Sequence, residues 1–307
     1  VDDVNGWDMV GNISTNQYYM GQFQEDNNPA NNSNTHGTNV AGCVSGVADN
    51  GVGIAGIGYK VKIWPIKCAS EQISQGILRG YHAILYASSF EEIKIINCSW
   101  GGPGFSITEE DIINTAFERG CLVVTSAGND GMNVDNGGAY PACYKNCFSI
   151  GMTRSNDKAY VMSNWGYLVD VYAPGVSVYT TEAGNRYKKA TGTSFSSPMT
   201  AGIAALLLSY RPNYTHKQLW HQIRSSSDNV VNPSDRGRYY GRANAYRALD
   251  ENKLPGIEAI SAALTGESAL TDYSEYELEV TVTNYLFNAN NVVVDLESQG
   301  GFLDLSE

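Results

Sequence analysis

Short apolar segments alternate with amphipathic segments along most of the chain. The apolar segments have the length and composition of buried strands and cover residues 93–98, 121–127, 148–151 and 168–172. Apolar side chains recur at helical spacing over residues 72–90, 108–119 and 214–226, and a capping box at Thr108–Asp111 is expected to open the second of these helices. We therefore predict an α/β fold, in which a mainly parallel sheet has helices on both faces and carries its site at the carboxyl ends of the strands.

A change of pattern near residue 250 divides the chain into two parts. The 307 residues are more than a typical single core organises. Residues 251–256 contain a Pro-Gly linker signal, after which residues 276–284 and 291–296 have the patterns of strands. We predict an α/β domain over residues 1–250, a linker over 251–256, and the start of an Ig-like β-sandwich over 257–307.

The composition excludes several classes of partner. With 20 basic and 32 acidic residues, the chain has a formal net charge of -12, which disfavours nucleic acid and anionic membrane surfaces. No apolar run approaches the roughly 20 residues that span a bilayer. Of the 6 cysteines, Cys143 and Cys147 could close a local disulfide. A zinc pair is less favoured, because no histidine or second cysteine pair lies nearby.

Three polar residues stand where this kind of fold places reactive groups. Ser194 follows Gly192 at the start of a helix of small and apolar residues, where free N–H groups and the helix dipole stabilise negative charge. His36 opens another helix of small residues, and Asn129 follows the apolar run at 121–127. Acyl transfer needs such a nucleophile, a base and an oxyanion donor. The structural alternatives are a helix cap for Ser194 and a capping or core histidine for His36.

The order and context of these residues resemble those of the subtilisin-like serine proteases. Residues 36–42 (HGTNVAG), 127–129 (AGN) and 192–198 (GTSFSSP) are similar to the family's histidine, oxyanion and serine motifs, and the match covers nearly all of residues 5–250. The resemblance implies a secreted or cell-surface serine endopeptidase that acts on polypeptides without a catalytic cofactor. It makes Ser194 the nucleophile of the acyl-enzyme, His36 the general base and Asn129 the oxyanion donor.

The same resemblance implies where a substrate and a structural ion bind. An edge strand pairs with an extended substrate backbone through Ser99, Trp100 and Gly101, for which an ordinary exposed loop is the alternative. The primary specificity pocket is walled by Ser126, Ala127 and Gly128. The loop at residues 49–54 is similar to the family's calcium loop, in which the matching ligand positions are Asn50, Val52 and Ile54. A plain turn is the alternative for that loop.

The catalytic aspartate of the family has no counterpart in this sequence. The family's aspartate lies in an Asp-Ser/Thr-Gly turn upstream of the histidine, and none of the four aspartates before His36 is followed by Ser/Thr-Gly; they are Asp2, Asp3, Asp8 and Asp26. We predict that the family's first strand and its aspartate lie on an N-terminal piece outside this sequence, and that a separate N-terminal fragment is one form in which this piece could supply the aspartate. The alternatives are a pseudoprotease or peptide-binding module that keeps the groove, and a structural surface protein whose β domain carries the function.

Overall fold

The structure is a computed structural model that describes residues 6–30, 34–73, 76–229, 241–250, 257–265 and 277–286. The chain forms two compact units, Val1–Asn252 and Lys253–Glu307. The predicted linker over residues 251–256, the strand predicted over 291–296, and Asp2 and Asp3 lie outside the described residues.

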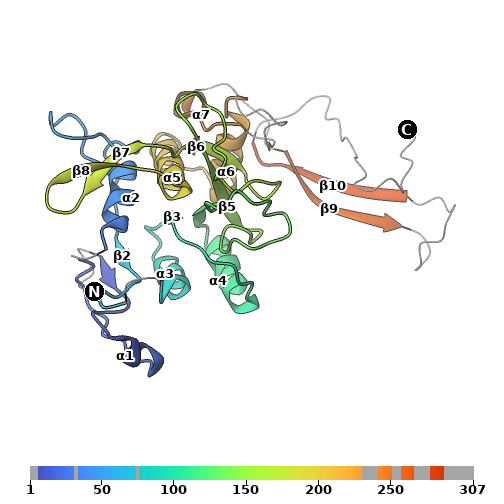
Figure 1. Cartoon of the computed structure of the whole chain (residues 1–307). Coiled ribbons are helices and arrows are strands. Elements are labelled where there is room, and N and C mark those ends of the chain that lie inside the picture. Colours follow the sequence, from blue (N-terminus) through green and yellow to red (C-terminus); the bar gives the residue numbers. More distant parts are fainter. Residues whose placement is uncertain are drawn as a thin grey trace. The chain divides into compact units, whose positions relative to one another are not determined.

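The first unit contains the α/β elements that the sequence predicts, and Figure 1 shows their arrangement. Its strands are β1 (Trp7–Asp8), β2 (Ile66–Lys67), β3 (Ile95–Cys98), β4 (Leu122–Ser126), β5 (Cys147–Thr153), β6 (Val171–Pro174), β7 (Val178–Glu182) and β8 (Arg186–Ala190). Its helices are α1 (Thr15–Tyr19), α2 (His36–Ser45), α3 (Gly80–Ala87), α4 (Ile107–Glu118), α5 (Thr193–Tyr210), α6 (His216–Ser225) and α7 (Ala245–Leu249).

The central sheet has the strand order β3-β4-β5-β6, and each neighbouring pair is parallel. Every residue of β4 and β5 is buried, as expected for parallel strands with a helical layer on each side. Alternate side chains of β4 enter two different cores, because successive residues of a strand point to opposite faces. Leu122 and Val124 pack with residues of α5, α6 and α7, whereas Val123 packs with residues of α3 and α4. The predicted α/β class is therefore confirmed.

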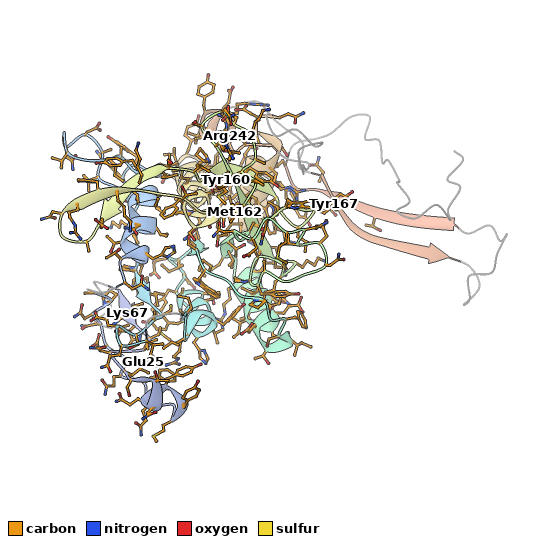
Figure 2. All side chains as sticks on the ribbon, viewed as in Figure 1. Glu25, Lys67, Tyr160, Met162, Tyr167 and Arg242 are labelled. Atoms are coloured by element: carbon orange, nitrogen blue, oxygen red, sulfur yellow. The ribbon has the colours of Figure 1, made fainter. Side chains whose placement is uncertain are left out.

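Two smaller sheets complete the first unit. β1 and β2 form a parallel pair, where the Lys67 ammonium lies 2.8 Å from the Asp8 carboxylate in a nearly buried ion pair (Lys67 is labelled in Figure 2). β7 and β8 form an antiparallel hairpin that the sequence did not predict. β8 reads Arg-Tyr-Lys-Lys-Ala and has neither an apolar run nor a clear alternation, so periodicity gave no signal for it.

Two predictions about helix starts were wrong. The helix expected over residues 72–90 begins only at Gly80, and Gly76 upstream has a φ of 110°, far from helical values. The second helix begins at Ile107 with Ser106 as its N-cap, so Thr108 lies inside the first turn and the predicted capping box does not form. Glu109 and Glu110 still lie in that first turn, where acidic side chains favour the positive end of the helix.

The second unit is described as one antiparallel pair, β9 (Ile257–Thr265) with β10 (Glu277–Asn284). The register runs from Glu277 opposite Thr265 to Asn284 opposite Ile257, with a β-bulge between Thr281 and Val282. β10 coincides with the predicted period-two run, whereas β9 was not predicted. The Ig-like sandwich stays a prediction.

The six cysteines are all free thiols in this structure. Cys143 and Cys147 do not form the local disulfide that their spacing allowed; the Cys143 thiol instead lies 3.6 Å from the Val134 carbonyl oxygen.

Candidate active site

Ser194 is the second residue of α5, which begins directly after the N-cap Gly192. The Phe195 N–H donates to the Gly192 carbonyl at 3.0 Å and closes the first turn. Ser194 is half-buried, whereas Ser196 and Ser197, which follow it in the same helix, are fully buried. The serine therefore lies at the surface, beside the free N–H groups of a helix start.

A chain of side-chain hydrogen bonds fixes the start of α5 to the carboxyl end of β3. The Ser197 hydroxyl donates to Asn97 Oδ1 at 2.7 Å, and Asn97 Nδ2 donates to Ser99 Oγ at 3.0 Å. The Ser99 hydroxyl then donates to the Ser194 carbonyl at 2.9 Å. Because Ser197 and Ser99 are buried, breaking the chain would leave polar atoms without partners. The position of Ser194 is therefore set both by α5 and by the end of β3.

Asn129 lies in the loop after β4, and Thr193 fixes the orientation of its carboxamide. Asn129 Oδ1 accepts a hydrogen bond from the Thr193 N–H at 2.8 Å and a second from the Thr193 hydroxyl at 3.0 Å. Thr193 Oγ1 in turn accepts the Gly128 N–H at 3.1 Å. With its oxygen held by two donors, the carboxamide keeps its NH₂ group free to donate beside Ser194, and Asn129 is exposed.

Asn164 also supports the loop that carries Asn129, and it was not identified from the sequence. It is completely buried, its Oδ1 accepts the N–H groups of Asp130 at 3.0 Å and Met132 at 3.2 Å, and its Nδ2 donates to the Ala127 carbonyl at 2.9 Å. Nothing in its sequence context distinguishes it from a loop asparagine. The Gly131 N–H adds a bond to the carbonyl of Met162, labelled in Figure 2.

His36 is the first residue of α2, and hydrogen bonds at His36 and at Asn39 hold the start of that helix in place. Its N–H donates to Asn34 Oδ1 at 3.1 Å, and farther along the helix Asn39 Nδ2 donates to the Thr181 carbonyl of β7 at 2.6 Å. The His36 ring meets the Phe195 ring edge-on with centroids 6.1 Å apart. The histidine thus lies beside the residue that follows Ser194.

Among the described residues, the electrostatic surroundings of His36 contain a positive charge and no acidic partner. Neighbouring protein atoms displace water from the imidazole and lower its pKa, although the residue as a whole retains an exposed surface, and the positive charge of Lys188 lowers the pKa further. Within the described ranges, no carboxylate bonds to His36. The Ser194 hydroxyl donates to the Ser99 carbonyl at 3.4 Å and not to His36. The serine and histidine are neighbours without a direct hydrogen bond.

Residues 99–101 lie between β3 and an isolated bridge that Gly102 forms with Tyr140. They are not a regular strand in this structure. The backbone groups of Trp100 and Gly101 make no hydrogen bond to any described residue, so they are available to an extended peptide. Ser126 ends β4, and Ala127 and Gly128 lead from it to Asn129. The predicted substrate residues and the predicted oxyanion donor therefore lie at adjacent strand ends.

The predicted calcium residues lie in the loop after α2, apart from the cluster around Ser194. Asn50 Oδ1 accepts the Val52 N–H at 2.9 Å, and Asn50 and Val52 are exposed. The donor set is one side-chain oxygen with the carbonyls of Val52 and Ile54, all hard oxygens that suit calcium. Calcium takes about six to eight oxygens, so further ligands would come from outside this set.

Comparison with known proteins agrees with this arrangement. The model of the subtilase family matches residues 4–247, and the chain belongs to that family. It is 34% identical over 249 residues to thermitase from Thermoactinomyces vulgaris, covering 80% of this chain and 81% of thermitase. It is 36% identical over 218 residues to a thermophilic serine proteinase of a Bacillus species, covering 70% of this chain but only 52% of the relative.

Solved structures lead to the same fold. A protease from Pseudoalteromonas arctica superposes with a TM-score of 0.64 and 26% identity, covering 80% of this chain and 82% of that chain. The chain is thus a serine endopeptidase of subtilisin type, with polypeptides as its substrates. Among the described helices, none has the length and apolar character needed to cross a membrane.

Proposed function

We propose that residues 1–250 hydrolyse peptide bonds through an acyl-enzyme on Ser194. Ser194 Oγ attacks the scissile carbonyl while His36 takes its proton, and His36 then returns that proton to the leaving amine. Water, activated by His36, attacks the ester and releases the acid product. Asn129 Nδ2 and the free N–H groups at the start of α5 stabilise the oxyanion of each tetrahedral intermediate.

The observation that carries this proposal is the double hydrogen bond from Thr193 to Asn129. It joins the residue before the nucleophile to the oxyanion donor, at 2.8 and 3.0 Å, and so orients one free NH₂ group beside Ser194. A serine that only capped a helix would not need a neighbouring donor held in this way. The substrate backbone pairs with Trp100 and Gly101, and its side chain next to the scissile bond enters the pocket walled by residues 126–128.

The acid partner of His36 completes the proposal. A carboxylate that accepts the other imidazole N–H fixes the tautomer and stabilises the imidazolium, and its loss costs about 10⁴-fold in rate. We assign this role to an aspartate on a separate N-terminal fragment. The absence of a described carboxylate at His36 favours one alternative, a weak or inactive pseudoprotease that binds peptides in the same groove.

Three further properties belong to this proposal. The enzyme is secreted or attached to the cell surface, residues 257–307 begin an Ig-like domain, and calcium binds the loop through Asn50, Val52 and Ile54. The ion would neutralise the oxygen cluster and tighten the loop, without a part in the chemistry. A thermal-unfolding series with calcium and with a chelator tests the ion, because Asn50→Ala should abolish any calcium-dependent rise in Tm.

A fluorophosphonate probe tests the catalytic proposal directly. It phosphonylates an activated serine and expels fluoride, and its P=O oxygen occupies the place of the oxyanion. We expect one adduct, located at Ser194 by peptide mass spectrometry and lost in Ser194→Ala. The exposed Ser89 supplies the matched control, since Ser89→Ala should label like the parent protein. No adduct on Ser194, in protein supplied with the acidic fragment, would refute the enzyme and favour the peptide-binding module.

A further inference from the structure

The strand β8 concentrates positive charge beside the candidate active site. Its 5 residues include Arg186, Lys188 and Lys189, although the whole chain carries a formal net charge of -12. Over residues 176–192, which contain the β7–β8 hairpin, Glu182 is the one acidic residue. A single carboxylate cannot neutralise three cations, so this part of an acidic protein keeps a local positive field that attracts negatively charged groups.

The strand pairing determines which of the two lysines faces α2, the helix that His36 begins. Lys188 lies opposite Thr180, and cross-strand partners share one face of a hairpin. Thr180 is fully buried, and its hydroxyl donates to the Asn39 carbonyl of α2 at 2.5 Å. Lys189 lies opposite the exposed Tyr179 on the other face. Lys188 is accordingly half-buried against the side of α2, whereas Lys189 is exposed; Figure 1 shows the hairpin against this helix.

The face that carries Lys188 continues into the candidate active site. Ala190 is two residues farther along the same strand and therefore shares this face. Its cross-strand partner Val178 is buried in one apolar cluster with Phe195, and Ala190 packs against that cluster. The Phe195 ring in turn meets the His36 ring edge-on. Lys188 is thus held on the side of the site at which the histidine lies.

The charge of Lys188 reaches His36 and is only partly neutralised by its neighbours. Loss of water around the imidazole lowers the pKa of His36 most, and the positive charge of Lys188 lowers it further. Lys188 Nζ lies 3.6 Å from Glu182 Oε1, but Arg186 Nε lies closer to the same carboxylate, 3.3 Å from Oε2. The Lys188 side chain keeps 38% of its surface exposed, so a second carboxylate can reach its ammonium group.

The mechanism of the proposed function places the leaving half of a substrate on this same side. The backbone of residues 99–101 binds the half that becomes the acyl group, and residues 126–128 receive its last side chain. His36 passes its proton to the amine of the other half, so that half lies within reach of the imidazole. The first residues after the scissile bond therefore lie in the positive field that acts on His36.

We propose that Lys188 gives the enzyme a preference for aspartate or glutamate in the first two residues after the scissile bond. This inference rests on the proposed function and adds its substrate class, which is peptides that are acidic on the leaving side. The substrate carboxylate pairs with the half-buried Lys188 ammonium, where water and salt screen the attraction less than at a fully exposed site. Because partly exposed ion pairs are weak, we expect a gain of about three- to tenfold over a neutral side chain of the same shape.

Two other roles for Lys188 are less favoured by the same observations. A lysine that only keeps the surface soluble would lie on the exposed face, where Lys189 lies, and not on the face that packs against α2. A lysine whose role is to hold Glu182 in the hairpin would be its nearer partner, and Arg186 has that position. Removal of the Lys188 charge therefore leaves Glu182 with a cation and the hairpin with its pairing.

The experiment uses amines that accept the acyl group from Ser194, because such amines occupy the leaving side alone. The whole chain, supplied with the acidic fragment, is acylated by the p-nitrophenyl ester of acetyl-Ala-Ala-Phe at about pH 8, where His36 is neutral. Glu-Glu-amide, Gln-Gln-amide or Lys-Lys-amide then competes with water. The amine attacks the ester carbonyl, a peptide bond forms, the bond to Ser194 Oγ breaks, and the amine proton passes through His36 to Oγ. Mass spectrometry measures the ratio of peptide to acid product.

The expected preference depends on one charge. Glu-Glu-amide should form peptide about three to ten times faster than Gln-Gln-amide, and Lys-Lys-amide should be the slowest. Lys188→Met should lose most of this preference, whereas Lys188→Arg and the matched control Lys189→Met should keep most of it. Comparison of variants with the same amines removes differences in their intrinsic reactivity. Salt at about 1 M, where the screening length is about 3 Å, should reduce the preference of the parent protein.

The outcomes separate this preference from the proposed function. Ester hydrolysis that is unchanged in Ser194→Ala would refute the proposed function, and the preference with it. Acyl transfer that depends on Ser194 but has equal ratios in the parent protein and in Lys188→Met would leave the enzyme standing and overturn the preference. A preference that about 1 M salt does not reduce would overturn it as well, and that measurement requires no variant to fold.

Discussion

The Asn164 side chain occupies the space in which a side chain on residue 128 would have to lie. A Cβ built on Gly128 would be 2.3 Å from Asn164 Nδ2, and Gly128 has a φ of 103°, which L-residues rarely adopt. The same Asn164 supports the loop through three hydrogen bonds. The loop that carries Asn129 is therefore shaped by one glycine and one buried amide.

Substitutions at Gly128 and Asn164 should reduce activity, because they would displace the loop that carries Asn129. We expect Gly128→Ala and Asn164→Ala each to destabilise the fold by about 1–3 kcal/mol, the first by strain and the second by unsatisfied polar groups. Urea unfolding measures the free energy of unfolding. The rate at which the fluorophosphonate labels Ser194 reports whether the loop still places Asn129 correctly. The double variant removes the clash, so its loss of stability should be smaller than the sum of the two; strict additivity would contradict the contact.

Substitution of Asn129 should separate its two roles. Asn129→Ala removes both the NH₂ donor and the acceptor of the Thr193 bonds, whereas Asn129→Asp keeps the acceptor and loses the donor. Both variants should lower the rate of peptide hydrolysis by about 10²–10³-fold or more, because the oxyanion loses a hydrogen-bond donor. Only Asn129→Ala should also lower Tm. An Asn129→Asp variant with normal kinetics would exclude the carboxamide from the oxyanion site.

Lys188 should set the pH at which His36 becomes an effective base. Desolvation lowers the pKa of His36 and the positive Lys188 lowers it further, so the neutral base persists to lower pH. Removing the charge in Lys188→Met should raise the pKa of His36. In a pH profile of the rate of Ser194 labelling, the acidic limb should then move to higher pH. Lys189→Met is the matched control from the same strand. Equal profiles for the two variants would show that Lys188 does not act on His36.

His216 should make the fold sensitive to acid. Burial, with a smaller contribution from Lys217, lowers its pKa from 6.5 to about 4 in the folded state. Between these values the unfolded chain binds a proton that the folded chain does not, so stability is lost as the pH falls from about 6.5 to about 4. His216→Phe should reduce this loss in urea unfolding at pH 7 and pH 4.5, whereas His82→Asn at an exposed site should not.

The sequence predicted the parts of the structure in which local pattern and tertiary context agree. The runs that became β4 and β5 are apolar because both faces of the sheet are covered, so length and composition sufficed to find them. The helix predicted over residues 214–226 corresponds to α6, whose N-cap Thr215 forms a capping box with Gln218. The β7–β8 hairpin was missed because its cross-strand pairing, rather than its polar sequence, stabilises it.

The principal residues of the candidate site could be predicted from the sequence, whereas the residues that hold them in place could not. Ser194, His36 and Asn129 were recognisable by motif and order, and they stay predictions of catalytic roles. Asn164 has no sequence signal, since its three bonds go to backbone groups more than 30 residues away. Such contacts arise only when the loops after two strands fold over one another. The dependence of the site on buried amides is therefore visible in the structure alone.

The six free thiols have a consequence for the conditions in which the chain can fold. Burial raises the pKa of each, for Cys68 to about 12, so almost none is present as the reactive thiolate at neutral pH. No described element depends on a cross-link that a reductant could break. The described core is therefore packed without a cross-link, and we expect its Tm to be the same with and without a reductant.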